Sequence, residues 1–290
     1  MKTQIDLFNQ KIKLREMGVF PMIFVLIPLP YQNPKANIFT RKYNNMYLTF
    51  RTGGSRDVPS GKFPRSLLSL ITTQFMRQYK DIKGNKEKRT IELGNISSVA
   101  RKIGLTGVTG GKKGTGTFIT NAMQDLAELN ITTHCKIITE KFGGVRIENV
   151  NLIDEMQLLW NAKGKDEKEL FDSYLIISDK FSEMLIGHCV PIDLYVYNEL
   201  KSAQQQDLYA WAIRRLKTVN KEEIVPFDTL LPQFFDNVTR TSKPRQREDI
   251  KRNILEVTKY YPEAKIKATD TGLILSPSRL HIDEKNKGFV

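Results

Sequence analysis

Cysteine and histidine are scarce in this chain. Its 290 residues include two cysteines, Cys135 and Cys189, and three histidines. Two thiols cannot build a disulfide framework, so a reducing, cytoplasmic location is the simplest interpretation. The His-Cys pairs at residues 134–135 and 188–189 do not suggest a metal site, because adjacent residues on a strand point to opposite faces. We expect no bound metal.

The chain also lacks a hydrophobic run long enough to cross a bilayer. Its most apolar stretch, residues 20–30 (FPMIFVLIPLP), is shorter than the roughly 20 residues that a span needs, and Pro21, Pro28 and Pro30 interrupt it. No small-residue cleavage site follows, as it would in a signal peptide. We expect an extended segment that packs on the protein or on another subunit, and no membrane partner.

Catalytic motifs are absent as well. The sequence has no His-x-His site of the kind found in rolling-circle nickases, no G-x-S-x-G and no H-E-x-x-H. The carboxylates at residues 166–169 stand beside lysines and are interpreted as solvated charge. Tyr260 and Tyr261 are interpreted as aromatic residues at a helix end. We therefore expect that the protein is not an enzyme.

A glycine-rich loop at residues 106–117 (TGVTGGKKGTGT) invites a test for nucleotide binding. The phosphate loop of nucleotide hydrolases requires G-x-x-x-x-G-K-[ST], but Lys113 stands where the hydroxyl belongs and Thr106 where the first glycine belongs. The dinucleotide pattern G-x-G-x-x-G fails too, because Ile119 replaces its third glycine. The sequence therefore predicts no nucleotide cofactor.

Positive charge, by contrast, is abundant. The chain has 45 lysines and arginines against 32 acidic residues, which gives a net charge of +13. This surplus predicts a polyanionic partner: a nucleic acid, an anionic membrane surface or an acidic protein. The remaining composition, 40% hydrophobic and 27% charged, is ordinary for a globular protein of about two domains.

The order of the expected elements repeats along the chain. In each half, apolar spacing and turn residues predict a helix, a strand, two helices and a hairpin. In the first half these are residues 62–79, 90–93, 97–105, 117–130 and 131–152. In the second half they are residues 207–216, 223–226, 228–235, 244–261 and 265–275. We also expect a helix at residues 191–201.

This order is that of the winged helix-turn-helix, in which the third helix enters the major groove and the hairpin forms the wing. We therefore predict an α+β fold of two winged-helix domains in tandem, preceded by an N-terminal arm. The predicted division is an arm at residues 1–59 and domains at residues 60–164 and 165–290, with a polar linker at residues 161–169.

The first predicted recognition helix, the helix that would enter the major groove, is residues 117–130 and follows the glycine-rich loop. Thr117 is expected to cap it, and Phe118, Ala122, Leu126 and Leu129 are expected to face the core. Glycines let the backbone approach a phosphate, and asparagine or glutamine can read adenine. The candidate DNA-binding residues here are Lys112, Lys113, Thr115, Thr117, Thr120, Asn121 and Gln124, with Lys141 and Arg146 on the hairpin. The alternative is a surface loop before an ordinary core helix.

The second predicted recognition helix, residues 244–261, begins in a segment with more basic residues than the glycine-rich loop has. Residues 240–252 (RTSKPRQREDIKR) hold six basic and two acidic residues. Outward arginines can hold guanine through two hydrogen bonds, and lysines suit phosphates. The alternative is an exposed face of i, i+4 salt bridges, from Glu248 to Arg252 and from Arg252 to Glu256. The candidates are Arg240, Lys243, Arg245, Arg247, Lys251 and Arg252, with Lys265 and Lys267 on the second hairpin.

Several short segments, taken in order, resemble plasmid replication initiators of the RepA type, which are akin to TrfA-like initiators. They are GKFPR and SLLSLITT at 61–73, IELG at 91–94, GLTG at 104–107, VPIDL at 190–194, LKS at 200–202, DLYAWAIRRL at 207–216, YP at 261–262 and LSPS at 275–278. The resemblance covers roughly residues 60–285. It departs from the family near Gln74 and Trp160, and it does not extend to the arm before residue 60.

The resemblance implies a sequence-specific double-stranded DNA-binding protein that initiates plasmid replication. Such proteins bind repeats called iterons at the origin, promote opening of the neighbouring DNA, and recruit the host initiator and replicative helicase. They are not enzymes, and a homodimer is one state the resemblance allows. The alternatives are a tandem winged-helix transcriptional regulator and a basic scaffold for acidic proteins. Plasmid maintenance separates initiator from regulator, and a competitor-resistant shift on duplex DNA excludes the scaffold.

Overall fold

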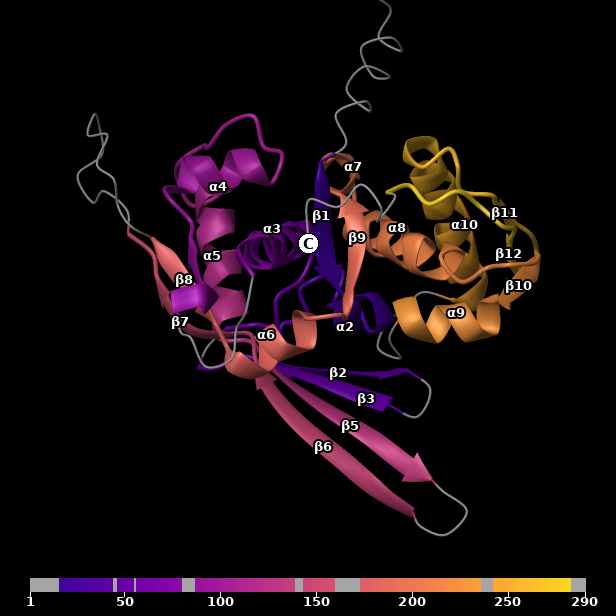
Figure 1. Cartoon of the computed structure of the whole chain (residues 1–290), viewed down its shortest axis with the longest axis horizontal. Helices are drawn as coiled ribbons and strands as arrows, with labels where there is room; N and C mark the ends of the chain where they lie inside the picture. Colours follow the sequence, from indigo (N-terminus) through magenta and orange to yellow (C-terminus); the bar gives the residue numbers. More distant parts are fainter. Residues whose placement is uncertain are drawn as a thin grey trace, which may run out of the picture. The chain divides into compact units, whose positions relative to one another are not determined.

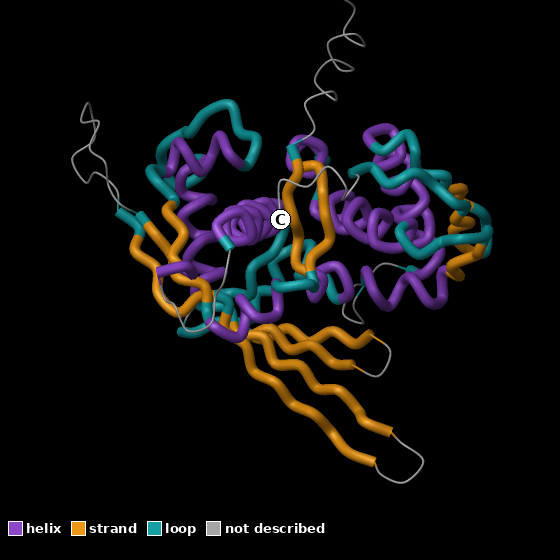
Figure 2. Tube along the Cα trace, in the orientation of Figure 1, coloured by secondary structure: helices purple, strands orange, loops and turns teal. Residues whose placement is uncertain are grey.

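The computed structural model describes residues 16–43, 46–54, 56–79, 87–138, 143–159, 173–235 and 242–282. Over these ranges the chain forms helices and antiparallel sheets (Figures 1 and 2). Contacts divide the chain into a central unit, residues 29–188, and a terminal unit, which joins residues 1–28 to residues 189–290. None of the helices in the described ranges combines the length and the apolar character that a bilayer span would need.

In the helical part of the central unit, the long helix α3 (Lys62–Gln78) packs against α5 (Thr115–Ala127) and β4 (Thr90–Glu92). This part also contains the short η1 helix (Glu87–Arg89), α4 (Ile96–Lys102) and α6 (Asp179–Leu185). Strands β4, β7 (Ile153–Gln157) and β8 (Tyr174–Ile177) form an antiparallel sheet in the order β4-β8-β7. The apolar residues of α3 at the predicted helical spacing are fully buried, namely Leu67, Leu68, Ile71 and Phe75.

A buried arginine fastens the start of α3 to the chain that precedes it. Arg65 is 1% exposed, and its guanidinium donates hydrogen bonds to the carbonyl oxygens of Leu29 at 2.6 Å and Gly61 at 2.7 Å. The guanidinium also lies 5.1 Å from the centre of the Tyr31 ring. The arginine of the GKFPR motif is therefore structural, because its charge is turned into the protein and satisfied there.

A four-stranded antiparallel sheet projects from the helices of the central unit (Figure 1). Its order is β2 (Ile38–Tyr43), β3 (Met46–Arg51), β5 (Asn130–Ile138) and β6 (Gly143–Asn151). The hairpin predicted at residues 131–152 is present as β5 and β6. It belongs to this sheet, however, because β5 pairs on its other edge with β3, from Met46↔Cys135 to Arg51↔Asn130. The prediction that this hairpin forms the wing of the first winged-helix domain is therefore corrected.

The terminal unit joins an early strand of the chain to its second half. Strand β1 (Met17–Pro21) pairs antiparallel with β9 (Cys189–Asp193). The helices are α2 (Met22–Leu26), α7 (Leu194–Glu199), α8 (Ala203–Leu216), α9 (Phe227–Phe234) and α10 (Lys243–Tyr260). Strands β10 (Glu223–Pro226), β11 (Ile266–Ala268) and β12 (Gly272–Leu275) form a sheet in the order β10-β12-β11. The core is aromatic: Tyr209 and Tyr261 are fully buried, and the Tyr209 hydroxyl lies 2.7 Å from Nδ1 of His281.

The structure divides the chain differently from the prediction. The predicted arm is split, since β1 pairs within the terminal unit while β2 and β3 join the central sheet. The predicted boundary at residue 164 falls inside the central unit, because β4 pairs with β8 beyond it. The predicted polar linker at residues 161–169 lies outside the described residues. Strand pairing, which composition does not reveal, decides both boundaries.

Two local expectations are also corrected. The stretch at residues 20–30 is not extended throughout, because α2 forms within it and buries Phe24 and Val25. The helix expected at residues 191–201 is instead strand β9 followed by α7. Asp193 marks the change, since its side chain accepts a hydrogen bond from the Val196 amide as the N-cap of α7.

The two units share one order of elements. The central unit runs α3, β4, α4, α5, β7, β8, and the terminal unit runs α8, β10, α9, α10, β11, β12. In each three-stranded sheet the last strand lies between the other two. In the central unit the β5–β6 hairpin is inserted after the third helix. The repeated order of helices and strands that the sequence predicted is therefore present. In the central unit, however, β7 and β8 form the hairpin of the repeat, where the prediction had placed β5 and β6.

Candidate nucleic-acid interface

Threonines tie the glycine-rich loop to the first turn of α5. The Thr109 amide donates to the Thr115 hydroxyl oxygen at 2.9 Å, and the Thr115 amide donates to the Thr109 hydroxyl oxygen at 3.0 Å. Thr117 donates its hydroxyl to the Gly111 carbonyl oxygen at 2.8 Å. The N-cap of α5 is Gly114, so Thr117 is not the cap that the sequence predicted. Thr115 and Thr117 instead hold the loop in one shape.

Gly114 allows the loop to close tightly. A Cβ atom at this position would lie 2.2 Å from the Thr109 carbonyl oxygen and 2.4 Å from the Gly110 carbonyl oxygen. The loop therefore folds back directly against the start of the helix. It presents Lys112 and Lys113 to solvent, and neither forms an ion pair with any residue in the described ranges. Free cations and helix N-terminal amides together suit an anion.

Arg56 covers the outer face of the second half of α5. Its guanidinium lies 2.7 Å from Oδ1 of Asp125 and 3.3 Å from Oε1 of Glu128, and it also donates to the side-chain oxygen of Gln124. Burial raises the pKa of the Asp125 carboxyl above its ordinary value, and Arg56 opposes that shift. The amide oxygen of Gln124, predicted to read a base, is thus already engaged.

The first half of α5 remains open. Asn121 is exposed and Thr120 is half-buried, while Ala122 and Leu126 face the core as predicted. Phe118 was predicted to be buried, but it is 44% exposed. Of the predicted base-reading side chains of α5, Asn121 is therefore the one that is both exposed and outside the Arg56 cluster.

The two hairpin residues predicted to contact phosphates, Lys141 and Arg146, are not shown to add free positive charge to the surface around α5. Arg146 lies on β6 of the four-stranded sheet, is exposed, and forms an ion pair with Glu148. Lys141 lies outside the described residues. Arg146 therefore contributes little uncompensated charge to a surface around α5.

Helix α10 turns its predicted apolar face inward. Ile250, Ile254 and Val257 are buried, as is Tyr261 just beyond the helix. Arg245 and Arg252 are exposed on the opposite side. This confirms the predicted helical phase, which places the basic residues at the start of α10 outward.

The cations of α10 differ in how far they are already paired. Three form ion pairs: Arg247 with Asp228 at 3.4 Å, Lys251 with Glu248 at 3.0 Å and with Asp270 at 3.2 Å, and Arg252 with Asp249 at 2.6 Å. The hydrogen bonds that the Lys251 ammonium donates to the carboxylates of Glu248 and Asp270 raise the pKa of Lys251. The pairs within the helix are i, i+3, not the i, i+4 pairs that the sequence suggested.

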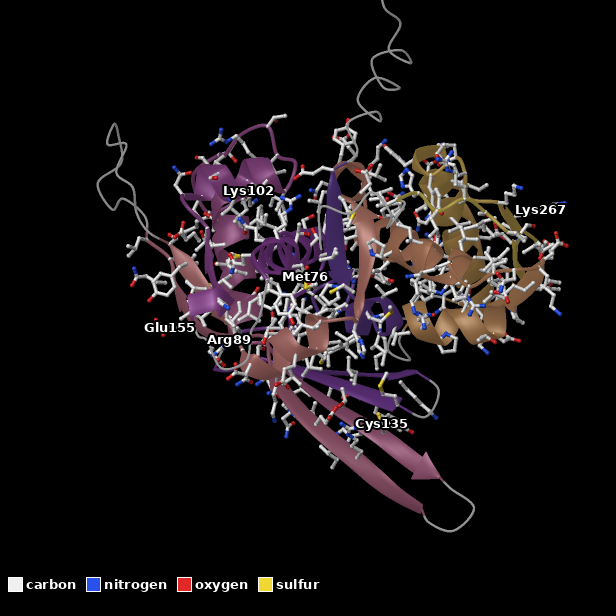
Figure 3. All side chains as sticks on the ribbon, viewed as in Figure 1. Met76, Arg89, Lys102, Cys135, Glu155 and Lys267 are labelled. Atoms are coloured by element: carbon white, nitrogen blue, oxygen red, sulfur yellow. The ribbon has the colours of Figure 1, made fainter. Side chains whose placement is uncertain are left out.

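Four predicted cations of the terminal unit have no ion pair with any residue that the structure describes. Lys243 and Arg245 occupy the first turn of α10 and are exposed. Lys265 and Lys267 are exposed immediately before and within β11, and Lys267 projects outward (Figure 3). Arg240 lies outside the described residues. The terminal unit thus presents cations without an ion pair among the described residues at the start of α10 and on the β11–β12 hairpin.

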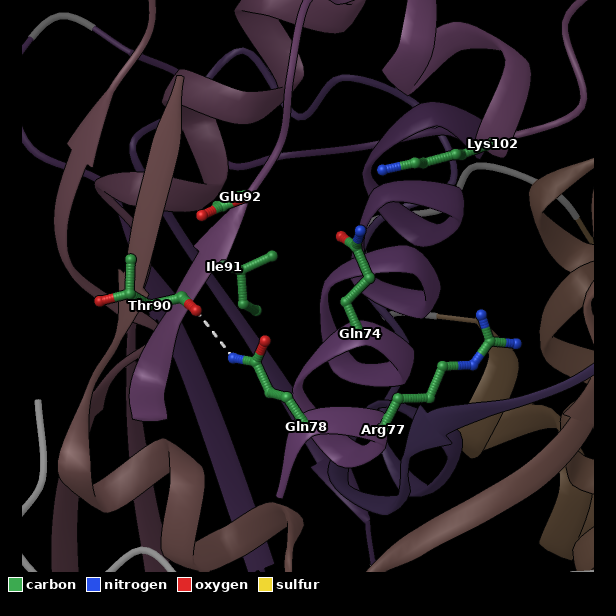
Figure 4. A pocket seen from close by; sticks show the side chains of 7 residues that line it. All are labelled: Gln74, Arg77, Gln78, Thr90, Ile91, Glu92 and Lys102. Atoms are coloured by element: carbon green, nitrogen blue, oxygen red, sulfur yellow. Dashed lines mark hydrogen bonds between the residues drawn. The ribbon is translucent and has the colours of Figure 1, made fainter. Parts of the chain in front are cut away.

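A surface cavity of about 810 Å³ lies in the central unit between the end of α3, β4 and α4 (Figure 4). Its charged lining is Arg77, Glu92 and Lys102, and the Gln78 amide donates to the Thr90 carbonyl oxygen at 2.7 Å. The lining holds a single carboxylate and no histidine or cysteine. Within the described part of the chain, no three histidine, cysteine, aspartate or glutamate side chains are placed to hold a metal ion.

The comparisons with known proteins identify the family. The sequence model described as the plasmid-encoded RepA protein matches residues 58–227, more than half of the chain. The chain belongs to this RepA family. The resemblance inferred from the short motifs is thereby confirmed, and membership supports a role in the initiation of plasmid replication. The match ends at the first residue of α9, so α10, β11 and β12 of this RepA-family chain lie beyond it.

Solved structures also resemble this RepA-family chain. A crystal structure of selenomethionine derivatives of domain 2 and domain 3 of RctB has a TM-score of 0.54 at 10% identity, and it covers 91% of this chain and 99% of that one. Another crystal structure of RctB domains 2–3 has a TM-score of 0.47 at 12% identity, covering 86% and 85%. At 10% identity the likeness to the first of these structures concerns the fold alone. No curated protein matches the chain significantly.

Two residues of this surface escaped the sequence analysis. Arg56 stands in the predicted arm, and no local pattern links it to α5, about 70 residues later. Phe118 fits the apolar spacing of a core face, so periodicity predicts burial. In the structure the Phe118 ring instead stacks on the ring of Phe63 from α3, with ring centres 6.0 Å apart, and stays partly exposed.

Proposed function

We propose that this RepA-family chain initiates plasmid replication by binding repeated duplex sites, the iterons, at the origin. One observation carries the proposal: both units repeat the same order of elements. In each, the helix that follows the second helix of the repeat, α5 or α10, starts beside exposed cations that have no ion pair with a described residue. We interpret each repeat as a winged-helix module. The wings are then β7–β8 in the central unit and β11–β12 in the terminal unit.

In a helix-turn-helix the N-terminal residues of the third helix contact base edges. The open first half of α5 fits this role, with Asn121 able to read adenine and with Lys112 and Lys113 placed for phosphates. In α10 we assign Arg245 and Arg252 to guanine. Lys243, Lys265 and Lys267 are assigned to phosphates. Each of the two helices is proposed to enter a major groove.

The same proposal includes what the chain does once bound. We propose that it is not an enzyme, that it promotes opening of the DNA beside the repeats, and that it recruits the host initiator and replicative helicase. A homodimer is proposed as a second state of the chain. What supports these steps is family membership.

The test of this function is maintenance of a plasmid that carries the cognate origin and no other initiator gene. We expect the wild-type chain to maintain the plasmid, and an Arg245→Ala variant to lose it while remaining folded by thermal melting. Specific binding to a repeat without plasmid maintenance would favour a transcriptional regulator instead. Failure to bind duplex DNA in the presence of competitor would overturn the proposal.

Lys112→Ala is expected to weaken binding to all duplex sequences alike, because Lys112 is exposed, unpaired among the described residues and assigned to a phosphate. The slope of log K against log salt should flatten by about one unit, since one fewer counterion is released. The measurement is a salt titration of binding to specific and random duplexes. Lys221→Ala removes an exposed lysine outside the proposed surface and should leave the slope unchanged. An unchanged slope for Lys112→Ala would contradict the assignment.

A further inference from the structure

Exposed large hydrophobic side chains are unevenly distributed among the described elements. They occur in strands and loops, but within helices there are two in the described ranges: Phe118, 44% exposed, and Leu255, 54% exposed. These lie in α5 and α10, the two helices proposed to read DNA. Single exposed hydrophobic residues are common and need no explanation by themselves. Of these two, Phe118 lies in the first turn of its helix.

Phe118 is held in a fixed position. It is the fourth residue of α5, and its ring stacks on that of Phe63 from α3, with ring centres 6.0 Å apart and ring planes inclined by 15°. Aromatic pairs of this kind contribute roughly 0.5–1.5 kcal/mol beyond burial. One face of the ring is therefore supported by the protein, while a large part of its surface stays open to solvent. The ring is positioned before any ligand arrives, and little side-chain freedom remains to be lost.

The surroundings of Phe118 are those of the proposed DNA surface. Asn121 lies one turn further along α5 and is exposed, and the loop with Lys112 and Lys113 precedes the same turn. The opposite half of the outer face is occupied by Arg56 with Gln124, Asp125 and Glu128. The part of α5 that remains open therefore offers one amide and one aromatic ring, next to phosphate-binding charge.

We propose that Phe118 reads thymine through the C5 methyl group of the base. This rests on the proposed function, in which the first half of α5 enters the major groove. The thymine methyl is the apolar group displayed there, and phenylalanine is among the side chains that contact it. Phe118 thus favours A·T or T·A at one position of the site, beside the base read by Asn121. Leu255 is not assigned this role, because it lies in the second half of α10, away from the turn that leads into the groove.

The experiment changes the DNA first, which leaves the protein intact. A duplex site is recovered from random-sequence DNA with the full-length wild-type chain, and each thymine is then replaced singly by deoxyuridine, which lacks the methyl group. At one or two positions within the segment contacted by α5, the substitution should weaken wild-type binding about fourfold, the worth of one buried methyl-sized group. At other positions it should have no effect.

The protein variants then locate the contact. Phe118→Ala should bind the thymine and deoxyuridine duplexes equally, at the level of wild type on deoxyuridine, and Phe118→Leu should retain part of the discrimination. Val145→Ala, which truncates an exposed residue of β6, should retain all of it. Discrimination that persists in Phe118→Ala, or wild-type binding insensitive to every deoxyuridine, would overturn this inference alone. Failure of wild type to select any duplex would overturn the proposed function, and this inference with it.

Discussion

Arg245→Ala is expected to lower affinity for the specific site by about 5- to 150-fold, the equivalent of roughly 1–3 kcal/mol for one bidentate contact to guanine. Arg245 is chosen because it is exposed in the first turn of α10 and has no ion pair with a described residue. Arg252→Ala should also lower the affinity for the specific site, but by a smaller factor. Arg252 already pairs with Asp249 at 2.6 Å, and this pair must open before the guanidinium reaches a base.

The matched control for this prediction is Arg245→Lys. Lysine keeps the charge but lacks the planar fork that donates two parallel hydrogen bonds. Affinity for random duplex should therefore stay near the wild-type value, while affinity for the specific site falls toward that of Arg245→Ala. The measurement is competition binding on the specific site and on sites with each base pair changed. If both variants bind every sequence with the same loss, Arg245 contacts phosphate and the assignment is wrong.

Gly114→Ala is expected to abolish the contribution of α5 to specific binding. The added Cβ would lie 2.2 Å from the Thr109 carbonyl oxygen and 2.4 Å from that of Gly110, both backbone atoms that cannot move aside cheaply. The loop must open, and the hydrogen bonds between Thr109 and Thr115 that set its shape are lost. Since Lys112, Lys113 and the first turn of α5 depend on that shape, we expect roughly a hundredfold loss of affinity, or about 2.7 kcal/mol.

A second glycine of the same loop provides the control. A Cβ atom on Gly107 would meet nothing within 4 Å, so Gly107→Ala should bind DNA like wild type. Thermal melting of both variants separates a local change in the loop from loss of the fold. Wild-type affinity in a folded Gly114→Ala protein would show that the closed loop does not position α5 for binding.

The sequence predicted local elements well where periodicity and turn residues agree. The order of the last elements was predicted correctly because each signal for it is local. These signals are the basic start of α10, its inward Ile250 and Ile254, and the Asp270–Gly272 turn. It could not predict the partners of strands. Residues 131–138 form a strand by pattern alone, but pairing with residues 46–51 is a long-range choice that moves the hairpin into another sheet. The paired β1 and β9 were missed for the same reason.

The candidate site was predictable in its charge and less so in its geometry. Lys112, Lys113 and Arg245 are exposed, as a basic segment beside an amphipathic helix suggests. Whether a cation is free depends on carboxylates that arrive from elsewhere. Asp270, in the β11–β12 turn, forms an ion pair with Lys251. Arg56, which lies well before α5 in the sequence, forms an ion pair with Asp125 in the second half of that helix. Such pairings follow from the fold and leave no mark in the local sequence.

Hydroxyl-radical footprinting of the selected duplex tests the central claim most directly, because it reports each contacted backbone segment separately. For wild type the account predicts two protected segments, one for α5 with its loop and one for α10 with its hairpin. Gly114→Ala should erase the first and leave the second, and Arg245→Ala should weaken the second first. A single undivided footprint that both variants lose together, or one that neither variant alters, would contradict the assignment of these two helices to DNA.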